Sequence, residues 1–188
     1  MQVCCSDLVQ QSEDIHMNVN GRKTKEMLIG PLAKNPPPPL SLNGTLVDRV
    51  SSFKLLGVHI STDLKWKEHV QVIASKAASR LHFLKQLKRA GAPTRDLLHF
   101  YTTVVRPILE YACPVWHSGL TNAQSDALES MQKRAMRIIY SEGTSFDYQF
   151  RLIIAGIDTL QDRREILAER FVQSSRFAEQ LTSSSSAT

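Results

Sequence analysis

The 188-residue sequence is poor in the groups on which secreted and membrane proteins depend. It has three cysteines and no C-x-x-C pair, which excludes a disulfide framework and the common spacing of a zinc site. No apolar run approaches the ~18 residues of a membrane span, and the N-terminus lacks the pattern of a secretory leader. We therefore expect an intracellular protein, cytoplasmic or nuclear, that is not secreted and has no membrane partner.

Motifs for catalysis and for cofactors are also missing. The sequence contains no P-loop, no G-x-G-x-x-G loop and no G-x-S-x-G elbow. Its six histidines are scattered, and none belongs to an H-E-x-x-H or His-x-Asp pattern. Asp162 and Glu165 lie among arginines, where solvated ion pairs explain them better than acid–base catalysis. We expect no enzyme activity from this chain alone, and no metal or cofactor.

Positive charge, in contrast, is plentiful. The formal net charge is +5, which modestly favours a polyanionic partner. Basic residues gather near the middle of the chain, opposed there only by Asp63, Glu68 and Asp96. A solvated helix face explains this cluster, and so does contact with the backbone of a nucleic-acid duplex. The candidate nucleic-acid-binding residues are Lys65, Lys67, Lys76, Arg80, Lys85, Lys88 and Arg89.

The first sixty residues predict a small β-rich lobe with one helix. Helical spacing favours a helix over 1–14, and 26–29 form a short strand before a Gly-Pro pair. Asn43-Gly44 lies between apolar residues, which is a strong hairpin signal. Two or three strands bury too little to be stable alone, so we expect this lobe to pack against something else.

Two further features complete the lobe. The prolines of 36–39 predict a stiff extended loop, with an SH3 or WW ligand as the weaker alternative. Apolar and β-branched residues from Phe53 to Ile60 predict one buried strand, with Gly57 where a side chain would obstruct a close backbone approach. Asp63 is expected to cap the helix that follows.

From His69 the apolar period changes from two to about 3.6, which predicts helices. Lys76 and Arg80 lie on one flank of the first helix and Lys85 and Arg89 on the other. Its apolar stripe consists of Val70, Ile73, Ala77, Leu81 and Leu84. This helix ends at 91–93, and the next, from Thr94, is apolar around much of its circumference and kinked by Pro107.

The remaining chain also predicts helices. An apolar connector at 113–117 is expected to pack Trp116 on the bundle, and Thr121 with Gln124 predicts a capping box. The helix after that box has a polar face formed by Gln132, Lys133, Arg134 and Arg137. A loop over 141–147, a short helix stopped by Gly156 and a last helix capped by Asp158 follow. The predicted class is therefore α+β, mostly α: a hairpin and a strand, then a helical bundle.

Several segments, taken in order, resemble the reverse transcriptases of non-LTR (LINE-type) retrotransposons. The resemblance covers roughly residues 18–164, and its specificity lies in the ordered set more than in any one motif. The segments are Asn20 to Met27, Phe53 to Val58, Leu64 to His69, Arg106 to Tyr111 with Val115-Trp116, and Leu128 to Ile139.

The resemblance implies roles for particular residues. Lys23 occupies the position of a lysine that, in related polymerases, can protonate the pyrophosphate leaving group or orient the nucleotide. The segment that contains Phe53, Leu55, Leu56 and Gly57 is similar to the primer grip, which presses on the primer strand. The helices that follow are similar to the thumb, which clasps the template–primer duplex. The implied domains are a palm-end remnant at 1–62, a thumb-like bundle at 63–140, C-terminal helices at 141–181 and a disordered tail at 182–188.

The sequence departs from this family in one feature that determines whether polymerase activity is expected. Polymerase chemistry needs carboxylates that hold two Mg²⁺ ions, and this sequence has no Asp-Asp pair. In the intact parent polymerase the palm would carry them. We therefore expect a catalytically incomplete fragment that binds an RNA/DNA or DNA duplex and needs no cofactor of its own.

Two alternatives remain. The region of 1–27 is similar to a segment associated with AlkB homologue 8, a tRNA-modifying dioxygenase and methyltransferase, but the sequence lacks an iron-binding His-x-Asp pair and a glycine-rich S-adenosylmethionine loop. The chain also fits a helical interaction module that contacts the missing palm and fingers or a second copy of itself. That alternative expects Phe100, Tyr101 and Trp116 on a partly exposed patch.

Overall fold

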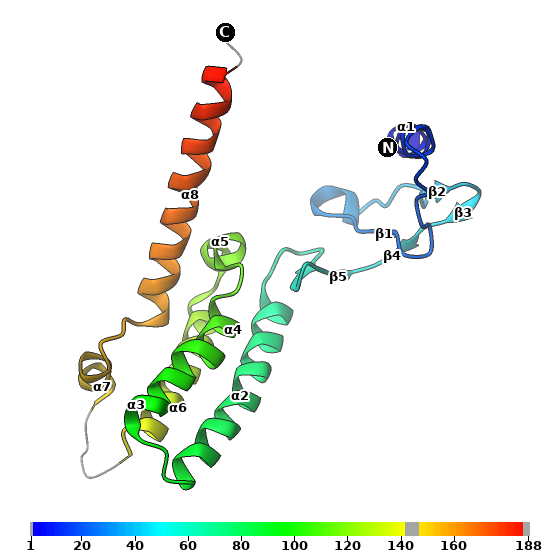
Figure 1. The fold of residues 1–188 in the computed structure, drawn as a ribbon. Helices are drawn as coiled ribbons and strands as arrows, with labels where there is room; N and C mark the ends of the chain where they lie inside the picture. Colours follow the sequence, from blue (N-terminus) through cyan, green and yellow to red (C-terminus); the bar gives the residue numbers. More distant parts are fainter. Residues whose placement is uncertain (1, 142–146, 186–188) are drawn as a thin grey trace. The chain divides into compact units, whose positions relative to one another are not determined.

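The computed structural model describes residues 2–141 and 147–185, with side chains described over 6–141 and 147–176. The chain separates into two compact units, Met1–Lys65 and Trp66–Thr188 (Figure 1). The described residues are mostly helical, and their sheets have two strands each. The predicted α+β class with a majority of helix is confirmed.

The first unit begins with a helix and contains the predicted hairpin. Helix α1 (Gln2–Asp14) matches the helix expected over the N-terminal residues. Strands β2 (Ser41–Leu42) and β3 (Thr45–Leu46) pair antiparallel. Their turn residues, Asn43 and Gly44, have φ angles of 49° and 75°. Both angles are positive, as a two-residue hairpin turn requires, and these residue types tolerate them best.

A second pair of strands joins segments far apart in the sequence. Strand β1 (Lys25–Glu26) runs parallel to β4 (Asp48–Arg49). The buried Glu26 carboxylate accepts two hydrogen bonds from the Arg49 guanidinium, at 3.0 and 3.1 Å. Of the strand predicted at 26–29, only Glu26 belongs to β1, and the chain then turns at Gly30 (φ 69°) into a 3₁₀ turn, η1 (Gly30–Ala33). The proline segment 36–39 has no regular secondary structure, as predicted.

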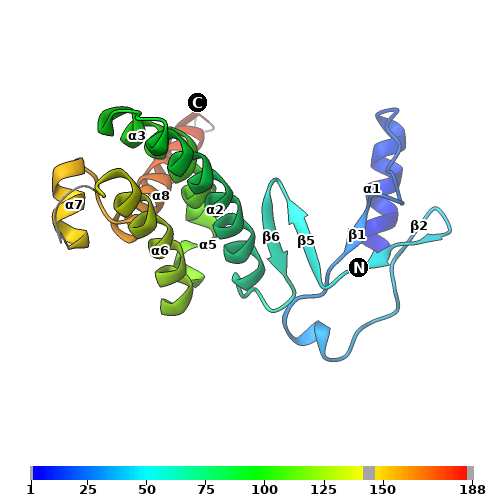
Figure 2. The same ribbon diagram turned by 90° about the horizontal axis from the view of Figure 1, so that it is seen from below.

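The single buried strand predicted at Phe53 to Ile60 is wrong. The structure forms a hairpin of β5 (Ser52–Leu55) and β6 (Val58–Ser61) instead (Figure 2). Leu56 and Gly57 make the turn, with φ angles of 46° and 91°. Glycine adopts such angles freely, whereas leucine pays about 1–2 kcal/mol. Gly57 therefore permits a reversal of direction here, not a close backbone approach.

The second unit starts with the long helix α2 (Lys67–Arg89), whose predicted apolar stripe is buried throughout. Its end at Arg89, before Gly91 with a φ of 82°, agrees with the prediction. Capping by Asp63 is wrong. The Asp63 carboxylate instead accepts the backbone N–H of Lys65 at 3.0 Å and the Ser61 hydroxyl at 2.7 Å, all within the first unit.

The next helical segment contains a wider turn where Pro107 was expected to cause a kink. Helix α3 (Thr94–Phe100) leads into a π-helical turn, η2 (Tyr101–Val105), and then into α4 (Arg106–Glu110). Proline has no backbone N–H to donate one turn back, so the regular hydrogen-bond ladder cannot continue through this position. The segment buries Leu97, Tyr101, Val105 and Leu109 completely.

The segment after α4 packs around two tryptophan rings, Trp66 and Trp116. The predicted connector forms a short helix, α5 (Cys113–Trp116), followed by η3 (His117–Gly119). Trp116 is fully buried, as expected, and its indole donates to the Tyr111 carbonyl at 3.0 Å. A Cβ on Gly119 would lie 2.5 Å from the indole nitrogen of Trp66, so only glycine fits beside that ring.

Helix α6 (Asn122–Ile139) lies beside α2 in the bundle (Figures 1 and 2). Thr121 and Gln124 form the predicted capping box, with hydrogen bonds of 3.3 and 2.8 Å. Gln132 does not lie on the polar face where the sequence pattern placed it. Its side chain is fully buried together with Leu128, Ala135, Met136 and Ile139.

Two helices complete the second unit. Helix α7 (Tyr148–Ala155) is capped by Asp147 and stops at Gly156 (φ 64°), as predicted. Helix α8 (Leu160–Ser185) is capped by Thr159, whose hydroxyl accepts the Asp162 N–H at 3.1 Å, so the cap assigned to Asp158 is wrong.

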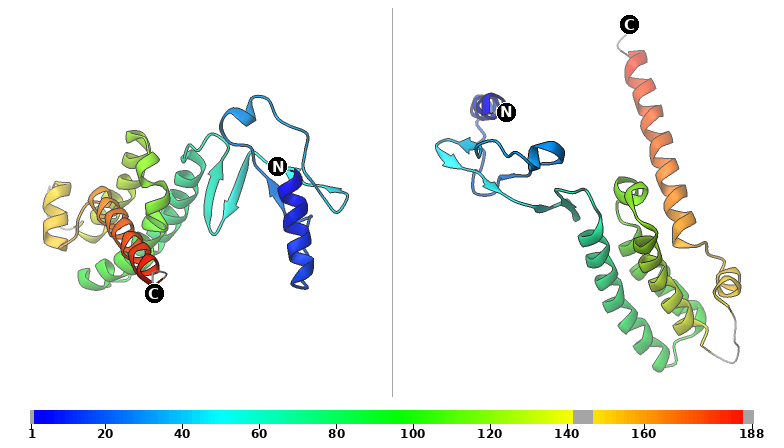
Figure 3. Two further views of the ribbon diagram at one scale, coloured as in Figure 1. Left: turned by 90° about the horizontal axis from the view of Figure 1, so that it is seen from above. Right: turned by 180° about the vertical axis from the view of Figure 1, so that it is seen from behind.

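Helix α8 runs past α5 and continues through 182–185, where the sequence predicted disorder (Figure 3). Residues 142–146 of the loop predicted over 141–147, and the last residues, 186–188, lie outside the described residues. Within the described ranges, no helix has both the length and the apolarity that a membrane crossing requires.

Candidate nucleic-acid interface

Helix α2 presents its cations on two separate flanks. Eighteen residues make about five helical turns, so Lys67 and Lys85 lie on the same side, with Arg89 one turn further. We call these three residues the lysine flank. Lys76 and Arg80 lie on another side, which they share with Phe83 and Leu87, and we call these four residues the aromatic flank. All seven side chains are exposed. The arrangement follows the two flanks that the sequence predicts.

Two of the seven predicted cations do not join these flanks. Lys65 is the last residue of the first unit, so it is not grouped with the cations of α2. Lys88 is half-buried, and its ammonium donates to the Ile139 carbonyl at 3.5 Å. That carbonyl lies at the C-terminal end of α6, where helices leave acceptors unsatisfied and attract cations. Lys88 therefore links α2 to α6 and has a structural contact that the sequence pattern did not predict.

Other cations lie on the neighbouring helix α6. Arg134 and Arg137 are exposed near its C-terminal end. Lys133 is exposed as well, and its ammonium lies 5.3 Å from the centre of the Tyr148 ring. Because Arg134 and Arg137 are exposed cations near the C-terminal end of a neighbouring helix, they provide a control for the role of the cations on α2.

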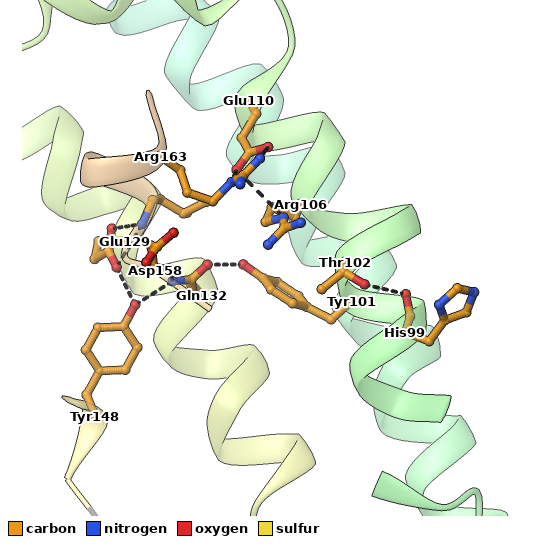
Figure 4. A network of polar contacts seen from close by, with 11 residues as sticks. His99, Tyr101, Thr102, Arg106, Glu110, Glu129, Gln132, Tyr148, Asp158 and Arg163 are labelled. Atoms are coloured by element: carbon orange, nitrogen blue, oxygen red, sulfur yellow. Dashed lines mark hydrogen bonds and ion pairs between the residues drawn. The ribbon is translucent and has the colours of Figure 1, made fainter. Parts of the chain in front are cut away.

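A buried polar network holds the helices of the second unit together (Figure 4). The Gln132 amide accepts a hydrogen bond from the Tyr101 hydroxyl and donates to the Tyr148 hydroxyl and the Asp158 carbonyl, both at 2.9 Å. Tyr148 in turn donates to the Glu129 carboxylate. Burial raises the pKa of the Tyr101 and Tyr148 hydroxyls well above their usual range. Both therefore stay protonated and act as donors.

An ion-pair cluster adds a second connection between helices. The Arg163 guanidinium of α8 binds the Glu110 carboxylate of α4 at 2.7 and 3.3 Å, and Arg106 lies 3.7 Å from the same carboxylate (Figure 4). Hydrogen bonding to Glu110 raises the pKa of Arg163. These contacts fix α8 to the bundle that carries α2, so they position the two flanks without contacting them.

An apolar groove opens beside the aromatic flank. It has a volume of about 450 Å³ and lies between α2 and the α3–η2 segment. Phe83 is 50% exposed and Leu87 38% exposed. The patch expected from the sequence is therefore wrong in two of its members, because Tyr101 and Trp116 are fully buried and only Phe100 reaches this surface. Sequence reasoning missed this groove, and the signal that could have pointed to it is Phe83, an aromatic residue three positions after Arg80 and outside the apolar stripe of α2. The groove is lined by Arg80, Phe83, Gln86, Leu87, Ala90, Phe100 and Val104.

The residues assigned to a primer grip lie on the second hairpin of the first unit. Phe53 and Leu55 alternate by two along β5 and are 39% and 51% exposed, and Leu56 in the turn is 84% exposed. The structure thus brings them together on the exposed strand and the turn of one hairpin. Lys23 is exposed in a separate turn, where its backbone N–H donates to the Asn20 side chain at 3.1 Å.

In the described part of the chain, no group of three or more His, Cys, Asp or Glu residues is arranged to hold a metal ion.

Comparison with known proteins finds a similarity in the helical unit. Residues 66–106 match the family model described as alkylated DNA repair protein alkB homolog 8, N-terminal. The matched segment spans α2 through the start of α4, and it is less than half of the chain. The expected similarity of residues 1–27 to this family is thus misplaced, because the match lies in the helical unit. No curated protein and no solved structure shows significant similarity to the chain.

Proposed function

We propose that this chain is a catalytically incomplete part of a non-LTR retrotransposon reverse transcriptase and binds template–primer nucleic acid through α2. The observation that carries the proposal is the lysine flank, three exposed cations along one side of a single long helix. Lys85 and Arg89 lie one turn apart and Lys67 lies ~27 Å further along the helix, so the flank offers contacts to separated backbone phosphates and favours binding without base specificity. The ordered sequence resemblance to these polymerases supports the identity of the ligand.

In this proposal the chain by itself does not catalyse polymerisation. Phosphoryl transfer by two Mg²⁺ ions needs acidic ligands held close together, and this sequence has no Asp-Asp pair. The exposed hairpin residues Phe53, Leu55 and Leu56 provide an apolar surface that suits contact with a primer strand. In this proposal they act with Lys23 only when the remainder of a polymerase is present.

The alkB homolog 8 match favours a second candidate, a helical module shared with the N-terminal region of that family. The matched segment, 66–106, contains both flanks of α2. An alkylation-repair or methyltransfer activity would need an iron-binding His-x-Asp pair or a glycine-rich cofactor loop, and the sequence contains neither. The second candidate is therefore a binding module, and it differs from the first in the identity of its partner.

A matched pair of charge reversals tests the proposal. Lys85→Glu with Arg89→Glu alters the lysine flank, and Arg134→Glu with Arg137→Glu makes the same change in charge near the end of α6. Binding of a labelled RNA/DNA duplex is measured by fluorescence anisotropy across a salt series. We expect the α2 variant to reduce the slope of log K against log salt by about two, since each lost phosphate contact removes ~0.9.

The α6 variant is expected to keep a slope close to that of the unaltered chain. Equal losses from both variants would mean that binding follows net charge and not the lysine flank. Absence of duplex binding by the unaltered chain at low salt would overturn the proposal. Binding that salt does not weaken would overturn it as well.

A further inference from the structure

The groove beside the aromatic flank combines features that the lysine flank lacks. Two phenylalanine rings, Phe83 from α2 and Phe100 from α3, line the same space together with aliphatic side chains. Its volume of about 450 Å³ falls within the ~300–1,000 Å³ typical of sites for small flat groups and other small ligands. A groove of this size admits a single ring system, whereas a duplex cannot enter it.

The polar groups of the groove lie where they can orient such a ring. The Arg80 guanidinium lies 5.9 Å from the centre of the Phe83 ring, and Lys76 is exposed one turn before it on the same side of α2. Gln86 also lines the groove, and its side-chain nitrogen lies 3.3 Å from the Nε2 atom of His82. An amide can both donate to and accept from the edge of a base.

The charge of the groove and the aromatic rings that line it indicate which kind of ligand it favours. The groove contains an arginine and no acidic residue among its lining side chains, so it favours a ligand with an anionic group next to an apolar or aromatic one. A nucleotide has this composition, because its base can stack on an aromatic ring while its phosphate meets a cation. An acidic amphipathic peptide could also pair a carboxylate with Arg80, but its aliphatic side chains would not stack on Phe83 and Phe100 as a flat base does.

We infer that this groove binds an unpaired base of single-stranded nucleic acid, which stacks on Phe83 while its phosphate contacts Arg80. The inference rests on the proposed function and deepens it, since the duplex would contact the lysine flank and a single-stranded extension the aromatic flank. Binding of this kind is tolerant of sequence, because every base has an aromatic face.

Three forms of one RNA/DNA duplex test the inference by fluorescence anisotropy. One is blunt, one has a four-nucleotide single-stranded extension, and one has an extension of the same length without bases. The last keeps every phosphate and removes only the stacking groups. We expect the extension with bases to bind about tenfold more tightly than the abasic one, as loss of one stacked base predicts.

Two variants localise the effect. Phe83→Leu keeps an apolar side chain in the groove and removes the aromatic face, so we expect it to abolish the tenfold difference and leave blunt-duplex binding and its salt dependence unchanged. Phe171→Leu makes the same change at an exposed phenylalanine of α8, outside the groove, and should keep the difference.

The outcomes distinguish this inference from the proposed function. Salt-dependent binding of the blunt duplex with equal affinity for both extensions would overturn the inference alone, as would equal effects of the two phenylalanine variants. A groove that serves protein contact would be revealed by self-association in sedimentation that Phe83→Leu abolishes while the tenfold difference is absent, and this result would also overturn the inference. Absence of blunt-duplex binding would overturn the proposed function.

Discussion

At the scale of single residues, Gln132 joins three segments of the helical unit. Replacement by methionine keeps the length of the side chain but leaves the buried Tyr101 hydroxyl without its acceptor and the Asp158 carbonyl without its donor. Each unsatisfied buried group costs about 1–3 kcal/mol. We therefore expect Gln132→Met to lower the free energy of unfolding by about 2–4 kcal/mol, measured by urea denaturation with tryptophan fluorescence.

The same substitution on the surface provides the control. Gln71 is an exposed residue of α2, and Gln71→Met should change stability by less than about 0.5 kcal/mol. Similar losses from the two variants would mean that the buried network contributes nothing beyond the packing of a helical side chain.

At the scale of elements, the turn between β5 and β6 contains a leucine where an asparagine would fit better. Leu56 has a φ of 46°, as Asn43 has a φ of 49° in the other two-residue turn. Asparagine tolerates this region, so Leu56→Asn should stabilise the hairpin by about 1 kcal/mol. We expect the amides of Ser52 to Ser61 to exchange with deuterium about fivefold more slowly.

The reverse change tests whether backbone conformation is the cause. Asn43→Leu places leucine at the matching position of the β2–β3 turn and should speed exchange there by a similar factor. If Leu56→Asn also weakens duplex binding while it stabilises the hairpin, the leucine side chain serves contact with nucleic acid. Faster exchange in the Leu56→Asn variant would contradict the explanation based on backbone strain.

At the scale of the whole molecule, the two units differ in how much they bury. Of the apolar side chains that are buried in the described part of the chain, four belong to the first unit and seventeen to the second. Two-stranded sheets are marginally stable by themselves. We therefore expect the first unit to unfold at lower urea than the second.

Both tryptophans, Trp66 and Trp116, lie in the second unit, so tryptophan fluorescence reports on that unit alone. Trypsin should cleave after Arg22, Lys34 and Lys54 at urea concentrations that leave the fluorescence unchanged. Cleavage within α2 should begin only with the fluorescence transition. Cleavage of both units at one urea concentration would show that they unfold together.

The sequence pattern was sufficient to predict the features that depend on residues close together along the chain. The Asn43-Gly44 hairpin, the capping box of Thr121 and Gln124, and the apolar stripe of α2 were predicted and are present. Each depends on local hydrogen bonds or on helical periodicity, which adjacent residues specify. The two flanks of cations on α2 follow from the same periodicity.

Features that depend on distant partners were missed. Gln132 has the spacing of a surface residue, and only contact with Tyr101, Tyr148 and Asp158 makes its burial favourable. The contact of the Lys88 ammonium with the Ile139 carbonyl at the end of α6 was likewise not predicted, because it joins residues 51 positions apart.

The segment from Phe53 to Ile60 also shows which properties depend on local sequence and which depend on tertiary structure. Its composition favoured one buried strand, but the segment folds back at Leu56 and Gly57, and the pairing of β5 with β6 leaves β5 exposed. The amino-acid sequence by itself determined which segments are helical and where positive charge lies along α2, because those properties need only near neighbours. The tertiary structure alone decided which polar groups are buried and where the groove opens, because burial depends on segments that meet only after folding.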